Sequence, residues 1–477
     1  MIALLCALVS GVLFFLSQGL FDVWWMAWIA PLPILWLAYG DCPRWTLFAA
    51  AFFGFAAGQG YMVQAYAGTL PWPAIVLMML GFGALFGFAV GRARAVQRRL
   101  PPAAALFAFP AIWTAIEFLY SLVSPHGTFG SIAYSQVSFP AAIQIAALTG
   151  LYGVTFLLCL FANALALLAR GARETGAMGL MVCALALAFG VAQLETPQLS
   201  AIRVAALADQ AAWRAAPRKP DRDAGAAMAR AYADAARAQA AKGARLIVIP
   251  ESALLLDPRW RDAVTQPLAE VARQMRATIV VGTVMVKPWR NVALAFQPDG
   301  TLASYDKRHL LPPFEDKFRP GTTPGLLGRG RAVAICKDMD FPRTIRADAR
   351  AAATLSAGGP QGIRVIAVPA NDFTKDDWIH ARMAVMRGVE NGFAVVRAAF
   401  NGLLTVSDSQ GRVIARAETT GKGVTAIFAA VEPGGGPTLY TQVGDMFAWF
   451  CTALALGLAL LSEVKARGHR HAQCNNE

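Results

Sequence analysis

The chain contains too little charge for a protein that lies entirely in water. Charged residues make up 15% of its 477 residues and hydrophobic residues 56%, whereas soluble globular chains have roughly 25% and 45–50%. The charge is also uneven: residues 1–199 hold seven Lys or Arg and five Asp or Glu, residues 200–442 hold 33 and 22, and residues 443–477 hold three of each. This composition excludes a purely soluble enzyme, a disordered scaffold and a disulfide-stapled secreted module. It predicts two membrane segments flanking one polar domain.

Eight apolar runs approach the length needed to cross a bilayer, about 17–25 residues. They lie near 2–18, 23–39, 46–67, 72–91, 103–123, 142–168, 177–194 and 443–462. Lys and Arg are absent from the loops near 19–22, 68–71 and 124–141, whereas the other loops and the tail contain them. The positive-inside rule therefore places the basic loops and both ends in the cytoplasm, and residues 200–442 on the periplasmic side. The net charge of +13 lies mainly in that polar domain, and we expect no nucleic-acid partner.

The polar domain has very little cysteine. Of seven cysteines only Cys336 lies within residues 200–442. A single thiol cannot form a disulfide within the domain, and an oxidising compartment would threaten it. Cys336 is therefore either buried and inert or retained for its reactivity.

The polar domain alternates short β-branched runs with Ala-rich helical stretches. The expected strands are 202–207, 245–250, 278–284, 292–297, 331–335, 365–369, 393–398, 403–407 and 424–430, and the expected helices are about 222–242, 258–276, 343–355 and 375–391. This alternation predicts an α/β fold with helices covering the sheet. Asp299-Gly300 and residues 407–412 have the composition of hairpin turns.

Three polar residues stand at or near the ends of separate predicted strands: Glu251, Lys307 and Cys336. The ends of strands are where an α/β fold gathers catalytic side chains. A carboxylate can take the proton of a thiol, the thiolate can attack a carbonyl, and an ammonium can hold the oxyanion. Spacing alone leaves structural alternatives open, because Glu251 could cap a turn, Lys307 could be a solvated cation, and a strand-end cysteine is often a small core residue.

The sequence around these three residues resembles the carbon–nitrogen hydrolase (nitrilase) superfamily. The similar segments are Val248–Ala253, Tyr305–Pro312 with Glu315, and the strand that ends at Cys336. The membrane context narrows the resemblance to the apolipoprotein N-acyltransferases, over almost the whole chain. The segments that carry this narrower resemblance are Pro110–Glu117, Tyr134–Gln136, Gly150–Phe156, His380–Glu390 and Thr438–Asp445.

The resemblance implies an αββα sandwich joined to a membrane base of about eight transmembrane helices. The expected domains are 1–199 in the membrane, 200–442 in the periplasm, and 443–477 as a last span with a cytoplasmic tail. The implied activity, in a bacterial inner membrane, is transfer of a fatty acyl chain from a phospholipid, through a Cys thioester, to the N-terminal amine of a diacylglyceryl-cysteine apolipoprotein. We expect a monomer that needs no cofactor and no metal.

The resemblance also implies a role for each matching residue. Glu251 corresponds to the general base, Cys336 to the nucleophile and Lys307 to the oxyanion stabiliser. Glu315 matches a further glutamate near the active site.

The two residues after the nucleophile depart from the family pattern, which has an aromatic residue and then a glutamate. Asp338 keeps the negative charge on a shorter side chain. Lys337 places a cation beside Cys336, and we expect it to favour the thiolate and to alter acyl or acceptor packing. The departures leave open a membrane-anchored nitrilase-like amidase, or an acyltransferase for a different amine. An inactive scaffold that serves as a receptor is a third alternative.

Overall fold

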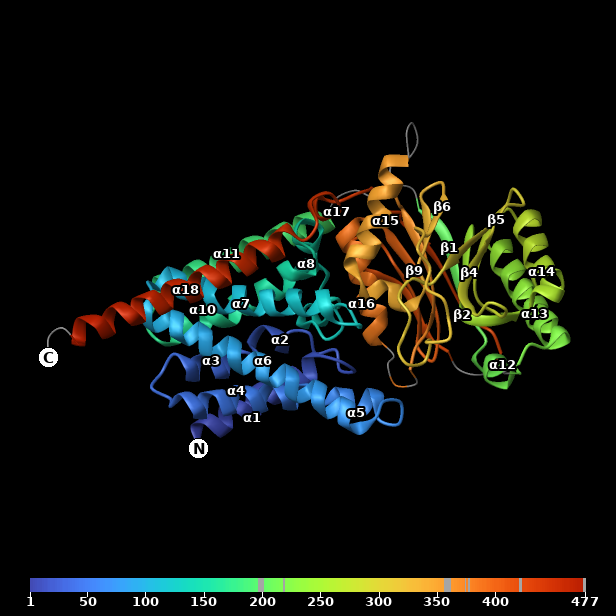
Figure 1. Cartoon of the computed structure of the whole chain (residues 1–477). Helices are drawn as coiled ribbons and strands as arrows, with labels where there is room; N and C mark the ends of the chain where they lie inside the picture. Colours follow the sequence, from blue (N-terminus) through green and yellow to red (C-terminus); the bar gives the residue numbers. More distant parts are fainter. Residues whose placement is uncertain are drawn as a thin grey trace. The chain divides into compact units, whose positions relative to one another are not determined.

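The computed structural model describes residues 1–195, 201–217, 219–355, 362–373, 375, 378–419 and 423–474 (Figure 1). The chain divides into two compact units. The first consists of 1–124, 128–195 and 443–477, and the second of 125–127 and 196–442. The expected boundary between residues 199 and 200 lies outside the described residues.

The first unit is built of apolar helices. In the described part of the chain, six helical segments are long and apolar enough to cross a membrane: Arg44–Tyr66, Trp72–Arg99 (α6), Pro102–Val123 (α7), Leu151–Ala169 (α10), Arg173–Leu194 (α11) and Met446–Gly468. The first contains α4 (Arg44–Gly58) and α5 (Tyr61–Tyr66), and the last is most of α18 (Met446–Cys474). Shorter apolar helices cover Ile2–Ser17 (α1), Met26–Ala38 (α2 and α3) and Pro140–Thr149 (α8 and α9).

The expected count of about eight spans is therefore approximate. The first two predicted runs form helices shorter than the other six. The run at 142–168 is interrupted at Gly150, whose φ of +69° ends α9 before α10 begins, a left-handed conformation that glycine adopts without steric cost. The short α1 packs closely on α4. A Cβ at Gly58 of α4 would lie only 2.4 Å from Cβ of Phe14 of α1, so glycine is needed for this close approach.

The second unit contains two six-stranded sheets. The first has the order β12-β1-β2-β3-β4-β5 and the second β11-β10-β9-β8-β7-β6. The strands of the first sheet are β1 (Ile202–Ala208), β2 (Leu246–Leu256), β3 (Thr278–Met285), β4 (Arg290–Phe296), β5 (Leu302–Asp306) and β12 (Thr425–Val431). Those of the second are β6 (Leu326–Gly328), β7 (Arg331–Val333), β8 (Val365–Asn371), β9 (Ala394–Phe400), β10 (Leu403–Ser407) and β11 (Val413–Glu418).

The two sheets pack face to face between two layers of helices. Figure 1 shows α13 (Arg222–Ala241) and α14 (Arg261–Gln274) outside the first sheet, and α15 (Pro342–Leu355) and α16 (Trp378–Asn391) outside the second. One buried cluster joins side chains of both sheets, with Ile247 and Val281 from the first and Ala367 and Val396 from the second. The second unit is therefore the expected αββα sandwich.

The nine predicted strands and four predicted helices are all present, with ends shifted by a few residues. Both predicted hairpin turns are confirmed, since β4 pairs antiparallel with β5 and β10 with β11. Strands β5, β6 and β11 and the short helix α12 (Gln210–Ala215) were not predicted. The central parallel strands are buried on both faces, which explains why they are continuous apolar runs in the sequence.

Candidate active site

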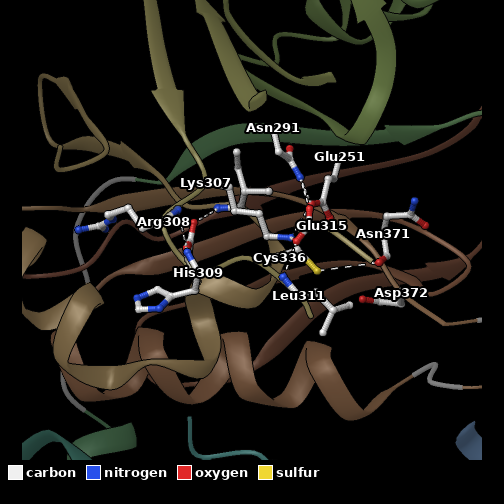
Figure 2. A network of polar contacts seen from close by, with 12 residues as sticks. Glu251, Asn291, Lys307, Arg308, His309, Leu311, Glu315, Cys336, Asn371 and Asp372 are labelled. Carbon is white, nitrogen blue, oxygen red and sulfur yellow. Dashed lines mark hydrogen bonds and ion pairs between the residues drawn. The ribbon is translucent and has the colours of Figure 1, made fainter. Parts of the chain in front are cut away.

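The structure brings the sequence-predicted residues Glu251, Lys307, Glu315 and Cys336 together within the second unit (Figure 2). Lys307 directly follows β5, a strand that was not among the predicted ones. Cys336 begins a short 3-10 helix, η3 (Cys336–Asp340), just after β7. Glu251 lies in the middle of β2 and not at its end, because that strand continues to Leu256.

An irregularity in β2 orients Glu251. The pairing of β2 with β3 shifts register between Ile249 and Leu254, and Ser252 has a φ of +58°. Beside this irregularity β3 carries Gly282, where a Cβ would lie 2.3 Å from Cα of Glu251. Only glycine lets the two strands approach closely enough at this point.

Lys307 forms a buried ionic cluster with two glutamates. Its Nζ donates to Oε1 of Glu251 and to Oε2 of Glu315, each at 2.8 Å. The side-chain amide of Asn291 donates to Oε1 of both glutamates, each at 2.6 Å. Lys307 is only 2% exposed, and both glutamates are buried. The cluster therefore holds two carboxylates and one ammonium in a fixed geometry away from water.

Cys336 is held in a left-handed backbone conformation with φ of +43°. For a non-glycine residue this conformation costs about 1–2 kcal/mol, and here it turns the side chain toward the ionic cluster. Figure 2 shows the sulfur beside the Lys307 ammonium and close to the glutamate side chains. The thiol lies 3.9 Å from the backbone carbonyl of Asn371, at the end of β8.

The charges of the site keep Cys336 protonated as a thiol and raise the pKa of a nearby carboxylate, Glu251. Burial raises the pKa of Cys336 well above its ordinary value, and the negative charge of Glu251 raises it further. Burial also raises the pKa of Glu251, against the opposing effect of Lys307. For Lys307 burial works against the ammonium, but Glu251 and Glu315 outweigh it and raise its pKa. A carboxylate with a raised pKa is a stronger proton acceptor than an ordinary glutamate.

The pKa of Cys336 lies above its ordinary value, because burial and the charge of Glu251 dominate at the sulfur. The charge of Cys336 helps to raise the pKa of Lys337, and the expectation that Lys337 favours the thiolate stays a prediction. Lys337 is itself buried, and its Nζ donates to Nδ1 of His126 at 3.0 Å.

Asp338 joins the nucleophile turn to the loop that carries Lys307. Its carboxylate accepts four hydrogen bonds, from the backbone N–H groups of Arg308, His309 and Ile335 and the hydroxyl of Tyr305, at 3.2, 2.9, 3.0 and 2.7 Å. Asp338 is fully buried. It therefore positions the backbone on both sides of the site.

Asn291 is a site residue that the sequence reasoning missed. In the sequence Asn291 is a single amide at the start of the apolar strand β4. In the structure Asn291 is 1% exposed. As for metals, the described residues contain no group of three or more His, Cys, Asp or Glu side chains that could hold a metal ion.

Comparison with known proteins agrees with this fold. The family model described as Carbon-nitrogen hydrolase matches residues 205–433, so the second unit belongs to that class. The model described as Apolipoprotein N-acyltransferase N-terminal domain matches residues 10–164. Together the two matches span most of the chain, which belongs to the apolipoprotein N-acyltransferase family.

Relatives with this name match the chain over nearly its full length. An apolipoprotein N-acyltransferase from Geobacter metallireducens is 28% identical, over 96% of this chain and 95% of its own. One from Vibrio cholerae is 25% identical, over 97% of this chain and 98% of its own. Among solved structures, an amidase from Nesterenkonia sp. is 21% identical, with a TM-score of 0.41, over 53% of this chain and 96% of that chain.

Proposed function

We propose that the protein transfers a fatty acyl chain from a phospholipid to the N-terminal amine of a diacylglyceryl-cysteine apolipoprotein. The observation that carries the proposal is the buried cluster in which Lys307 holds Glu251 and Glu315 beside the Cys336 thiol. The near full-length similarity to relatives named apolipoprotein N-acyltransferase supports it.

In the first half-reaction Glu251 takes the proton of Cys336, and the thiolate attacks the ester carbonyl of the phospholipid. The resulting oxyanion lies next to the Lys307 ammonium, which stabilises it. When the intermediate collapses, the carbon–oxygen bond breaks, and the proton on Glu251 passes to the departing alcohol. The products are a lysophospholipid and an acyl thioester on Cys336.

In the second half-reaction the neutral amine of the acceptor attacks the thioester carbonyl. Glu251 takes a proton from the nitrogen, Lys307 again stabilises the oxyanion, and the carbon–sulfur bond breaks. The proton then returns to the sulfur, which regenerates the thiol. The reaction exchanges one acyl bond for another, and the side chains described here supply every proton transfer.

The proposal places the enzyme in the bacterial inner membrane as a monomer, with residues 200–442 on the periplasmic side. The six membrane-length helices support a membrane location. The distribution of Lys and Arg between the loops supports the orientation.

The test is mass spectrometry of the purified protein after incubation with phospholipid, followed by addition of a diacylglyceryl-cysteine peptide. We expect an acyl mass on the Cys336 peptide that disappears as N-acylated peptide forms. Cys336→Ala should bind lipid but carry no acyl group. Discharge by water at the same rate with and without the peptide would indicate a hydrolase and contradict the proposal.

A further inference from the structure

Lys337, the residue after the nucleophile, is a buried cation. Its side chain is 4% exposed. Its Nζ donates to Nδ1 of His126 at 3.0 Å and lies 5.9 Å from the ring centre of Phe341. In the described part of the chain, no salt bridge joins Lys337 to a carboxylate. Because a buried charge is costly without a counter-charge, this position suits an anion that arrives with a ligand.

His126 is the side chain that contacts the Lys337 ammonium. The loop 125–127 belongs to the same compact unit as Lys337, and it lies against the end of η3, because a Cβ at Gly127 would be 2.3 Å from the carbonyl oxygen of Asp340. Burial and the nearby charge of Lys337 lower the pKa of His126 to about 4, so the ring is neutral near pH 7. A neutral ring that accepts at Nδ1 carries its proton on Nε2, so the ring adds no charge that competes with the Lys337 ammonium.

The neighbouring cluster of Glu251, Glu315 and Lys307 carries an excess of negative charge, which Lys337 can offset. When Glu251 and Glu315 are ionised, their two negative charges exceed the single positive charge of Lys307. An anionic lipid that brings its ester to Cys336 would be repelled by this excess. The positive charge of Lys337 offsets it at the residue next to the nucleophile.

The electrostatics of Lys337 itself agree with an anionic ligand. Burial lowers the pKa of Lys337, and the charge of Lys307 lowers it further. Asp340 acts in the opposite direction more strongly than Lys307 does, and Cys336 and Glu315 add smaller raising effects. A bound anion would add to the effect of Asp340 and stabilise the ammonium. Binding and charge at this site are therefore coupled.

We propose that Lys337 and His126 form a binding site for the phosphate group of the acyl donor. The inference rests on the proposed function and deepens it, because it assigns these residues to recognition of the donor and not of the amine acceptor. The phosphate and the reacting ester belong to the same glycerol unit of a phospholipid, so a phosphate held here places the ester near Cys336. The acceptor amine carries no such anion.

The test compares two acyl donors that differ only in the phosphate group. Acyl-Cys336 formation is timed by mass spectrometry in detergent micelles, with phosphatidylglycerol or with diacylglycerol carrying the same acyl chains. For Lys337→Met we expect the apparent KM for phosphatidylglycerol to rise about tenfold, the effect of one lost charge-assisted hydrogen bond. The apparent KM for diacylglycerol should rise much less, and Lys337→Arg should restore most of the affinity for the phospholipid.

A matched control removes a lysine elsewhere on the same unit. Lys317 is exposed, and its Nζ lies over the ring of Trp289 at 4.1 Å. Lys317→Met should leave both donors unaffected. His126→Ala should weaken binding of phosphatidylglycerol less than Lys337→Met does, because it leaves the charge of Lys337 in place.

The possible outcomes distinguish failure of the phosphate site from failure of the proposed function. If Lys337→Met slows both donors equally, Lys337 acts on the nucleophile, and the phosphate site is wrong. If it slows neither, the site is also wrong. If the wild-type protein forms acyl-Cys336 from neither donor, the proposed function itself fails.

Inorganic phosphate distinguishes a lipid-specific site from one that takes any phosphate. If it competes with phosphatidylglycerol in the wild type but not in Lys337→Met, the site binds the phosphate group from either source. If it does not compete while the donor difference persists, the site accepts the phosphate only as part of the lipid. Competition that survives in Lys337→Met would place phosphate binding elsewhere and overturn the assignment.

Discussion

At the scale of single residues, the site depends on one ammonium shared between two buried carboxylates. Asn291 gives each carboxylate a second donor. Without it, Glu251 and Glu315 would be held by Lys307 and, for Glu315, by the backbone N–H of Leu311 at 2.7 Å. The alignment of the base toward the thiol therefore depends on an amide that takes no part in proton transfer.

Asn291→Ala should slow formation of acyl-Cys336 by about 10- to 100-fold, since each lost hydrogen bond to a charged group contributes roughly 1.5–3 kcal/mol. Asn291→Asp should slow it further, because a third carboxylate would compete for one ammonium. Single-turnover mass spectrometry measures both rates. Normal acylation in Asn291→Ala would remove Asn291 from the site.

The pH dependence of acylation should report the raised pKa of Glu251. The base must be deprotonated, so activity is lost as the pH falls through its pKa. We expect the acid limb of kcat/KM to lie above the ordinary glutamate value of about 4.3. In Glu315→Gln the limb should move to lower pH, because the charge of Glu315 raises the pKa of Glu251. A limb that stays in place or moves upward would contradict this account.

At the scale of elements, the position of Glu251 depends on how closely β2 and β3 approach. A Cβ at residue 282 would contact backbone atoms, with the carbonyl oxygen of Pro250 at 2.5 Å, so the strand must move rather than a flexible side chain. Gly282→Ala should therefore cut acylation at least tenfold and destabilise the fold by about 1–3 kcal/mol.

A helix glycine provides the matched control for Gly282→Ala. At Gly225 in α13 the nearest atom to an added Cβ is 3.4 Å away, so Gly225→Ala should keep full activity and gain about 0.5–1 kcal/mol in stability. Acylation rates and thermal unfolding of both variants make the comparison. Equal effects of the two substitutions would show that the strand contact is unimportant.

In the first unit Glu117 connects three elements. Its carboxylate accepts hydrogen bonds from Trp113 on α7, from Ser131 and the Ile132 N–H next to η1 (Ile132–Gln136), and from Thr155 on α10. Glu117→Leu should lower the midpoint of thermal unfolding in detergent by several degrees, because buried donors left without a partner cost about 1–3 kcal/mol each.

Glu117→Gln is the conservative counterpart. It should unfold near the wild-type temperature, because the two hydroxyls can rotate to accept from the new amide. Activity per folded molecule should be unchanged in the glutamine variant. A loss of acylation without a loss of stability would indicate a catalytic role instead of a structural one.

At the scale of the whole molecule, the reaction requires the two substrates to use one thiol in turn. Acylation kinetics should therefore be ping-pong, with parallel double-reciprocal plots for phospholipid and acceptor peptide. Intersecting lines would favour a complex with both substrates and rule out the thioester as an obligatory intermediate.

Much of the architecture could be predicted because its signals are local. Strands such as β2 and β8 are continuous apolar runs, and the segments around Glu251, Lys307 and Cys336 resemble known motifs. The short β6 and the edge strand β11, whose exposure alternates, carry weaker signals. The interrupted run at 142–168 was predicted as one span because hydropathy does not record the backbone turn at Gly150.

The contacts that orient the site could not be predicted, because they depend on strand register. Asn291 reaches both glutamates only because β4 pairs with β3 in one particular alignment. The four donors to Asp338 come from separate parts of the chain, and a sequence comparison shows only that the residue is acidic. The pairing of Lys337 with His126, 211 positions away, leaves no local signal at all.

The partly buried position of Cys336 has a consequence for how long the enzyme survives. Oxidants attack the thiolate far faster than the thiol, and the proposed location exposes this lone cysteine to an oxidising compartment. Because its pKa lies well above the ordinary value, the sulfur stays protonated between turnovers and presents oxidants with its less reactive form. The environment that gives Glu251 its role as base in the proposed mechanism thereby also protects the resting enzyme from irreversible oxidation.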